Sequence, residues 1–194
     1  MRWLAGVLYR ITGNRLTPNM VTTVGALAYI PIAYLIVQGD FALAGVLHLV
    51  FGSLDMIDGE LARLTKKANQ FGALYDASTD RIKIGLLFAG VAGWMAANGH
   101  AEQVYVPLMA AVLSATVAYV KAKGEVGVAL QKRGLDHHQI NHVFVEGLVP
   151  FDFLNIYVAV GLFSGRVVEM SWAVLVLSGA TYFWLLVRVN DELE

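Results

Sequence analysis

Cysteine is absent from this 194-residue sequence, and charged residues are scarce at 15% of the chain. Without cysteine, the protein has no disulfide, no thiolate metal site and no cysteine nucleophile. The formal net charge is −1, so no excess of basic residues indicates binding to nucleic acid. Because hydrophobic residues make up 57% of the chain, the composition is too apolar for a soluble domain of this size and predicts an integral membrane protein.

Six stretches of the sequence are apolar and long enough to span a bilayer, which takes about 20 residues. Turn residues separate several of them, and no repeat or long linker indicates a second domain. We therefore expect an all-α protein with one membrane domain over residues 1–194 and a six-helix core at about 20–188. The expected transmembrane helices are residues 20–38, 41–66, 72–97, 103–123, 140–163 and 167–188.

The basic residues indicate how this domain is oriented. All of them, Lys83 included, fall on one side of the six-helix arrangement, except Arg166. Since positively charged segments stay in the cytoplasm, we expect a multi-pass protein of the cell membrane with both termini cytoplasmic. Residues 2–15 are amphipathic, with Trp3 and Tyr9 among the apolar positions, which predicts a helix lying in the cytoplasmic interface of the lipid bilayer. The alternative for this segment is a flexible arm.

Four aspartates interrupt the apolar sequence between residues 55 and 80. Asp55 and Asp58 lie at the end of the second expected helix, and Asp76 and Asp80 at the start of the third, so each pair projects from one helical face. Carboxylates resist transfer out of water, so they are expected here only where a cation or a reaction needs them. Such an all-oxygen site favours hard divalent ions, Mg²⁺ or Mn²⁺, and two ions would neutralise the cluster. We expect this site to face the cytoplasm.

Residues around the aspartates indicate what the site could do. Gly59 and Gly72 lack a Cβ, so the backbone there can come close to a bulky ligand or to a neighbouring helix. Arg63 can bind a phosphate through two hydrogen bonds. This combination predicts transfer of a phosphate-bearing group between a lipid and a polar acceptor. The alternatives are a buried ion-pair network, a divalent-cation transporter with carboxylates near the bilayer midplane, and an aspartic intramembrane protease, which needs only two aspartates.

The spacing from Asp55 to Asp80 reads D-x2-D-G-x2-A-R-x8-G-x3-D-x3-D. It resembles the signature of the CDP-alcohol phosphotransferase family, with every fixed position filled. The resemblance covers nearly the whole chain and implies a six-helix membrane core with an N-terminal interfacial helix, assembled as a homodimer. It further implies that Asp55, Asp58, Asp76 and Asp80 bind two metal ions that bridge the CDP pyrophosphate, and that Asp80 deprotonates the acceptor hydroxyl as CMP is released. The residues implied to contact the CDP-linked lipid are Asn19, Thr22, Gly59, Ala62, Arg63, Asn69 and Gly72.

The acceptor alcohol is less well defined by the sequence. Residues 119–125 and 76–81 resemble the phosphatidylinositol-phosphate and archaetidylinositol-phosphate synthase branch, which implies inositol phosphate as acceptor. Residues 136–142, which include His137, His138 and His142, depart from the basic run common in that branch, so glycerol 3-phosphate and serine stay open as acceptors. The sequence also does not distinguish between a diacyl lipid and an archaeal ether lipid as the donor. The candidate acceptor-binding residues are Lys121, Lys123, Arg133 and His138, and the alternative for the lysines is a purely topological role.

Overall fold

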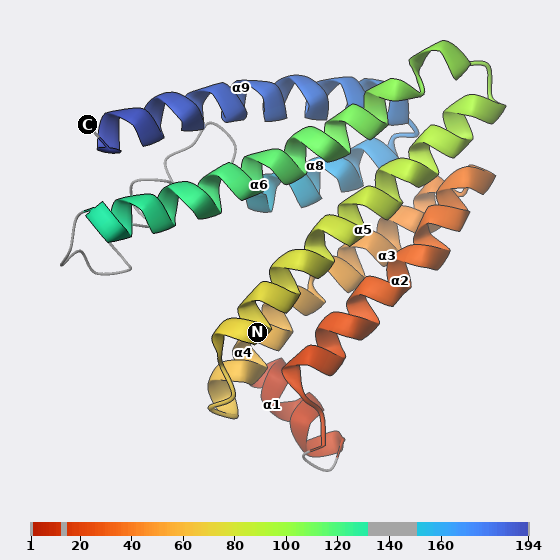
Figure 1. Ribbon diagram of the computed structural model, residues 1–194. Helices are drawn as coiled ribbons and strands as arrows, with labels where there is room; N and C mark the ends of the chain where they lie inside the picture. The colour runs from red at the N-terminus through yellow and green to blue at the C-terminus, as the bar shows by residue number, and fades with distance from the viewer. Residues whose placement is uncertain (1, 13–14, 132–150, 194) are drawn as a thin grey trace.

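The computed structural model describes residues 2–12, 15–131 and 151–193, and the regular structure within these ranges is entirely helical (Figure 1). The fold class predicted from the composition is therefore confirmed as all-helical for the described part of the chain. The helices are α1 (Arg2–Ile11), α2 (Pro18–Gln38), α3 (Phe41–Gly52), α4 (Leu54–Leu64), α5 (Gln70–Ala97), α6 (Tyr105–Gln131), α8 (Phe151–Phe163) and α9 (Val167–Leu193), with a short 3₁₀ helix, η1 (Ala101–Gln103), before α6.

Two of the expected helices agree closely with the structure. The helix expected at 20–38 corresponds to α2, and the helix expected at 72–97 corresponds to α5. The others differ at their ends: α1 stops at Ile11, α6 continues to Gln131 and α9 to Leu193. For the expected range 140–163, α8 accounts for residues 151–163, and residues 140–150 lie outside the described part of the chain.

The span expected over residues 41–66 corresponds to one apolar stretch long enough to cross a membrane, Phe41–Leu64, but the expectation of a single continuous helix is wrong, because the chain forms two helices there, α3 and α4. Ser53 separates them, and its hydroxyl donates to the Val50 carbonyl oxygen at 2.7 Å. The Met56 N–H bonds to the Ser53 carbonyl, which lies only three residues back, so the turn is tighter than in an α-helix. Serine competes with the helical hydrogen bonds in this way, and the two motif aspartates of this region therefore start a separate helix.

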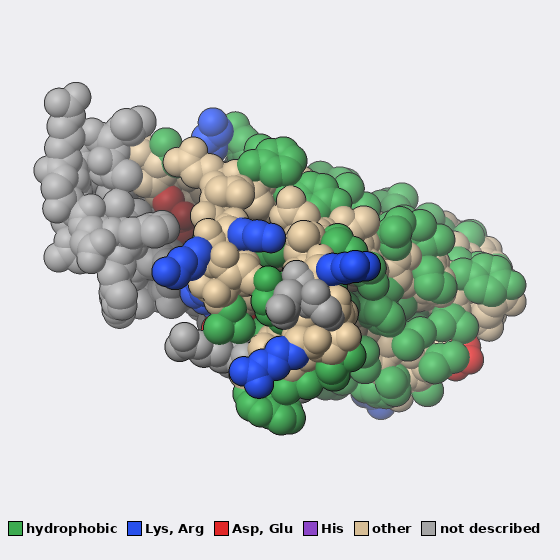
Figure 2. All heavy atoms as spheres, turned by 90° about the horizontal axis from the view of Figure 1, so that it is seen from below, with side chains coloured by type: hydrophobic (Ala, Val, Ile, Leu, Met, Phe, Trp, Pro, Cys, Tyr) green, Lys and Arg blue, Asp and Glu red, His purple; other side chains and the backbone are tan. Residues whose placement is uncertain are grey.

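Four stretches within the described residues are long and apolar enough to cross a membrane: Pro18–Gln38, Phe41–Leu64, Ala101–Gly127 and Val167–Asp191. The stretch Leu154–Phe163 is a shorter apolar helix, and α5 carries several charged side chains in its first half. Large apolar side chains are exposed on the outside of the bundle, for example Leu27, Val112 and Phe183. Exposed lysine and arginine side chains gather instead at the end where α1 and α4 lie (Figure 2). These features are those of a membrane protein in which exposed basic side chains are concentrated at one end of the helical bundle.

The helices form two groups (Figure 1). In the first, α2 packs against α3, α4 and α5, and in the second α6 packs along α9. Contacts between α5 and α6 join the groups, and α8 contacts both α3 and α9. The larger hydrophobic core, with Ile32, Phe88, Met95, Leu162 and Val174 fully or almost fully buried, lies where these helices meet.

Two local contacts fix the helices that carry the motif. A Cβ added to Gly90 of α5 would lie 2.8 Å from the Ala33 carbonyl oxygen, so α2 and α5 touch through their backbones at this point. At the basic end, Ala5 of α1 packs with Val21 of α2 and with Leu61 of α4 in a separate small core. As a result, α2, α4 and α5 hold a defined arrangement around the candidate site.

Candidate active site

A cavity of about 230 Å³ lies between the first turns of α2 and α5 and the second half of α4. Every residue that the sequence predicts to contact a CDP-linked lipid lines it, together with two of the predicted metal ligands. The lining consists of Pro18, Asn19, Thr22, Asp58, Gly59, Ala62, Arg63, Lys67, Ala68, Asn69, Gly72, Ala73 and Asp76. Residues from two separate parts of the sequence thus come together around one cavity.

Two helices begin at this cavity, and each has a side-chain cap. Thr17 Oγ1 accepts a hydrogen bond from the Met20 N–H at 3.3 Å at the start of α2. Asn69 Oδ1 accepts one from the Gly72 N–H at 2.7 Å at the start of α5, so Asn69 acts as a cap as well as lining the cavity. Helix N-termini carry a partial positive charge, and two of them directed at one cavity favour an anionic group such as a phosphate.

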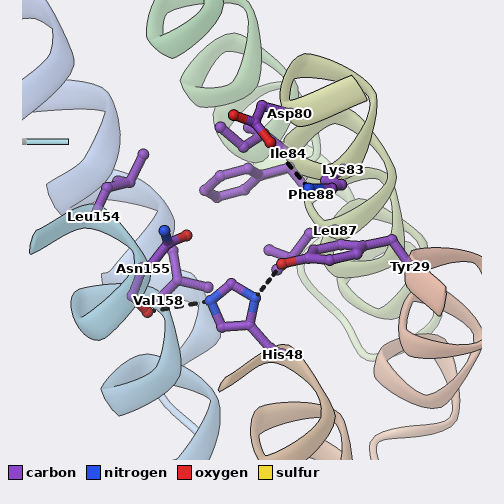
Figure 3. A pocket seen from close by; sticks show the side chains of 10 residues that line it. All are labelled: Tyr29, His48, Asp80, Lys83, Ile84, Leu87, Phe88, Leu154, Asn155 and Val158. Carbon is purple, nitrogen blue, oxygen red and sulfur yellow. Dashed lines mark hydrogen bonds and ion pairs between the residues drawn. The ribbon is translucent and has the colours of Figure 1, made fainter. Parts of the chain in front are cut away.

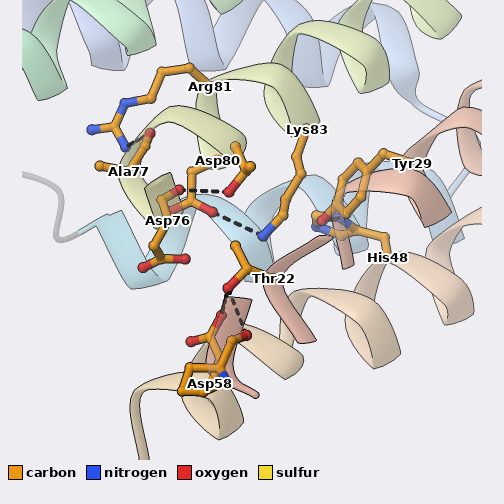
Figure 4. A network of polar contacts seen from close by, with 11 residues as sticks. Thr22, Tyr29, His48, Asp58, Asp76, Ala77, Asp80, Arg81 and Lys83 are labelled. Carbon is orange, nitrogen blue, oxygen red and sulfur yellow. Dashed lines mark hydrogen bonds and ion pairs between the residues drawn. The ribbon is translucent and has the colours of Figure 1, made fainter. Parts of the chain in front are cut away.

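Asp58 is the most deeply buried of the motif aspartates whose side chains the structure describes, with 4% of its surface exposed. The Thr22 hydroxyl donates a hydrogen bond to Asp58 Oδ2 at 2.5 Å (Figure 4). This bond joins α2 to α4 across the cavity. It also gives the buried carboxylate a partner, which a carboxylate removed from water requires.

Arg63 lies at the open side of the cavity, with 67% of its side chain exposed. Its Nη2 is 2.8 Å from Glu60 Oε1, one turn earlier on α4. An exposed pair of this kind contributes little to stability, so the guanidinium can exchange Glu60 for a phosphate at low cost. Glu60 was not singled out from the sequence, although its spacing of three residues from Arg63 is the signal that would have indicated the pair.

The glycines of the motif are not required by the packing of the protein itself. A Cβ added at Gly72 would come no closer than 3.5 Å to any neighbour, and at Gly59 no closer than 3.8 Å, both ordinary contact distances. Neither glycine has a positive φ angle. Of the two reasons for glycine left open by the sequence, close approach to another helix is therefore excluded at these positions, and close approach to a ligand in the cavity stands.

The carboxylates are arranged on two helices, α4 and α5. Asp76 lines the cavity, and Asp80 follows one turn further along α5 (Figure 4). Asp55 belongs to α4, and its side chain lies outside the described part of the structure. Among the described side chains, no three of His, Cys, Asp or Glu form a ready-made metal centre. The donor set nevertheless suits a hard divalent ion, because all of its members offer carboxylate oxygens.

Lys83 is the main functional candidate that the sequence interpretation missed, because it was counted among the cytoplasmic charges. The structure buries it to 3% exposure and places its Nζ 3.0 Å from Asp80 Oδ1. A lysine three residues after a motif aspartate shares its helical face, and this spacing is the signal that could have identified the pair.

A second, smaller pocket of about 50 Å³ lies beside Asp80 and Lys83 (Figure 3). His48 Nε2 lies 3.1 Å from the Asn155 carbonyl oxygen, and Nδ1 lies 2.9 Å from the Tyr29 hydroxyl. Because a carbonyl oxygen only accepts, Nε2 carries the proton, and in the neutral ring Nδ1 accepts from Tyr29. One side of the pocket is therefore lined by a polar link that joins α2, α3 and α8.

Of the four candidate acceptor-binding residues, the structure describes two, Lys121 and Lys123. Lys121 Nζ is 3.8 Å from Glu125 Oε1, and Lys123 Nζ lies 5.9 Å from the centre of the Tyr119 ring. Neither lysine lines either of the two cavities. Arg133 and His138, together with His137 and His142, lie outside the described residues.

Comparison with known proteins agrees with the motif. The family model described as CDP-alcohol phosphatidyltransferase matches residues 15–184, which confirms the resemblance predicted from the sequence. The phosphatidylinositol phosphate synthase of Corynebacterium glutamicum is 37% identical over 124 residues, which are 62% of this chain and 57% of that synthase. The match thus spans little more than half the length of that relative.

Two solved structures of the phosphatidylinositol phosphate synthase of Mycobacterium tuberculosis resemble the whole fold, each at 27% sequence identity. The structure with CDP-DAG bound has a TM-score of 0.78 and covers 97% of this chain and 92% of its own. The complex with manganese and citrate has a TM-score of 0.76 and covers 96% of this chain and 87% of its own.

Proposed function

We propose that this chain, which belongs to the CDP-alcohol phosphatidyltransferase family, transfers a phosphatidyl-type group from a CDP-linked lipid to inositol phosphate and releases CMP. The observation that carries the proposal is the cavity of about 230 Å³, around which the motif residues of α4 and α5 meet the first turn of α2. The similarity to phosphatidylinositol phosphate synthases, one of them solved with CDP-DAG, supports both the donor and the acceptor.

The donor would bind with its pyrophosphate between the two helix N-termini and Arg63. Gly59, Ala62 and Gly72 leave room for it, and Asn19, Thr22 and Asn69 supply polar groups along the cavity. The cavity would hold the polar part of the donor, while its lipid chains remain in the bilayer against the exposed apolar flanks of the helices.

The reaction would form a bond between the acceptor oxygen and the lipid-side phosphorus and break the bond from that phosphorus to CMP. Asp80 would take the proton of the acceptor hydroxyl as a general base. Two Mg²⁺ or Mn²⁺ ions held by Asp55, Asp58, Asp76 and Asp80 would polarise the pyrophosphate and stabilise the leaving CMP. The mycobacterial structure in complex with manganese and citrate supports dependence on a divalent metal.

The membrane arrangement is also proposed. We infer that α2, α3 with α4, α5, α6, α8 and α9 cross the cell membrane, so that the protein has six spans and its basic end faces the cytoplasm. On this arrangement α1 lies in the cytoplasmic interface, where the exposed Trp3 and Arg10 suit the apolar and headgroup sides respectively. Both termini would be cytoplasmic, and two copies would form a homodimer.

The proposed function is tested by the release of CMP. Purified protein in mixed micelles is incubated with CDP-diacylglycerol, Mg²⁺ and one acceptor. Inositol phosphate, glycerol 3-phosphate and serine are tested as acceptors in separate reactions. We expect inositol phosphate to give the highest kcat/KM, and an Asp76→Asn variant to be inactive with every acceptor. Preference for glycerol 3-phosphate or serine would overturn the choice of acceptor, and no CMP with any acceptor would overturn the reaction.

A further inference from the structure

The side chain of Lys83 is buried, and burying its positive charge costs free energy. Moving an ammonium group out of water costs several kcal/mol in real proteins, and a single carboxylate partner often fails to repay this. Lys83 is 3% exposed, whereas its partner Asp80 keeps 31% of its side chain exposed. The burial of the lysine therefore needs a reason beyond the strength of one ion pair.

Stability does not supply that reason. Lys83 and Asp80 both belong to α5 and are three residues apart, so their ion pair does not join two helices. On an exposed helix a pair with this spacing contributes only a few tenths of a kcal/mol, which is less than the cost of burying the ammonium group.

The geometry indicates what the lysine does for Asp80. Its ammonium lies on the buried side of the carboxylate and binds Oδ1 at 3.0 Å. Gly25 of α2 borders the lysine, since a Cβ added there would lie 3.9 Å from both Cε and Nζ. The ammonium is thus confined between α5 and α2, and the oxygen that it holds is fixed with it.

We propose that Lys83 is a positioning residue, which fixes Asp80 Oδ1 so that Oδ2 is presented to the acceptor hydroxyl. This inference rests on the proposed function, in which Asp80 accepts the proton of the acceptor. Neither Asp80 nor Lys83 lines the cavity assigned to the CDP-linked lipid, and Asp80 keeps its carboxylate when Lys83 is replaced, so we expect the transfer step to change and donor binding to be retained. Lys83 itself does not touch the reacting atoms.

The first test compares Lys83→Met with the wild-type protein, using CDP-diacylglycerol and the best acceptor. We expect kcat to fall about 10- to 100-fold, the usual effect of removing a group that orients a ligand or catalytic side chain. The Kd for CDP-diacylglycerol, measured directly by titration, should stay within about twofold of wild type. Lys66→Met is the matched control, because Lys66 is exposed, lines neither cavity and should leave kcat unchanged.

The second test separates positioning by a cation from support of the fold. In Lys83→Ala the pocket of about 50 Å³ beside Asp80 becomes continuous with the space that the side chain leaves. Methylammonium should enter this space and restore part of the lost kcat along a saturating curve, while tetramethylammonium, which has no N–H donor, should not. A purely structural lysine would not be replaced by a small ammonium ion in solution.

Three results would overturn the inference. They are a kcat for Lys83→Met within threefold of wild type, a loss of CDP-diacylglycerol binding that parallels the loss of kcat, and equal effects of the two ammonium ions on Lys83→Ala. Wild-type protein that releases no CMP would overturn the proposed function as well, so the two failures can be told apart.

Discussion

Thr22 on α2 and Asp58 on α4 share a hydrogen bond of 2.5 Å between Oγ1 and Oδ2. Both residues are buried, and both line the cavity assigned to the CDP-linked lipid. The bond therefore holds a proposed metal ligand in place and fixes the distance between two walls of the cavity. A residue assigned to nucleotide contact from the motif thus also organises the carboxylates.

Thr22→Val should disturb the site while preserving the volume of the side chain. Loss of the hydroxyl leaves Asp58 without this donor, which we expect to destabilise the fold by about 1–3 kcal/mol. Mn²⁺ affinity, measured by electron paramagnetic resonance, should fall about 10- to 100-fold. Thr116→Val is the control, because the Thr116 hydroxyl bonds only to the Val112 carbonyl of its own helix. Unchanged Mn²⁺ affinity in Thr22→Val would contradict this role.

Gly72→Ala tests whether the glycine serves the ligand. The added methyl group meets no closer neighbour than 3.5 Å in the protein, so the thermal midpoint should stay the same or rise. The KM for CDP-diacylglycerol should rise about tenfold, because an extra methyl group in an occupied site costs roughly 1–3 kcal/mol. Gly85→Ala, on the same helix with nothing within 4 Å of the added atom, should likewise keep or raise the thermal midpoint and should leave the KM unchanged. Equal KM values in the two variants would remove Gly72 from the donor site.

Removal of divalent metal should abolish activity. Protein treated with EDTA should release no CMP, and added Mg²⁺ or Mn²⁺ should restore turnover. Asp55→Asn and Asp76→Asn should each be inactive at ordinary Mg²⁺ concentrations, because each removes an anionic ligand from the proposed cluster. Far-UV circular dichroism provides the control for folding. Full CMP release from metal-free wild type would contradict the two-metal proposal.

Asp80→Asn should affect chemistry more than binding. An amide keeps the shape of the side chain but cannot accept the proton of the acceptor, so kcat should fall about 10²- to 10⁴-fold. Binding of CDP-diacylglycerol should be largely retained, because the amide oxygen can still face a metal ion and Asp80 does not line the cavity assigned to the donor. Single-turnover measurements of CMP release would isolate this step. A rate within a few-fold of wild type would show that another group is the base.

The double variant Lys121→Ala and Lys123→Ala tests the acceptor site. If these lysines bind the phosphate of the acceptor, its KM should rise about tenfold, equivalent to about 1.4 kcal/mol, while the KM of the CDP-linked lipid stays constant. Initial rates with each substrate varied separately would measure both constants. An unchanged acceptor KM would assign the two lysines to membrane topology alone.

Local signals in the sequence were sufficient for much of the fold, and the resemblance to a known family indicated the residues of the cavity assigned to the donor. The apolar stretches predicted α2 and α5 nearly to the residue, and the residues implied by the resemblance meet around the cavity. Motif residues are close together in the sequence or lie on facing helices, so helical periodicity places them well.

Features that depend on the three-dimensional environment could not be predicted in this way. The division at Ser53 results from a side-chain hydrogen bond inside an otherwise apolar run. The burial of Lys83 depends on how α2 packs against α5, whereas the sequence alone gives only its charge. His48 and Asn155 are 107 residues apart, and no pattern along the chain indicates their contact.

The two cavities differ in when the growing chain can complete them. Among the residues that the structure describes, those lining the larger cavity all lie between Pro18 and Asp76, so these walls exist once the first half of the protein has been synthesised. The pocket beside Asp80 requires Leu154, Asn155 and Val158 of α8, and its polar link to His48 cannot form before that helix is inserted. Because chains fold from the N-terminus as they are made, nascent protein should acquire the larger cavity first and the pocket beside Asp80 only near the end of translation.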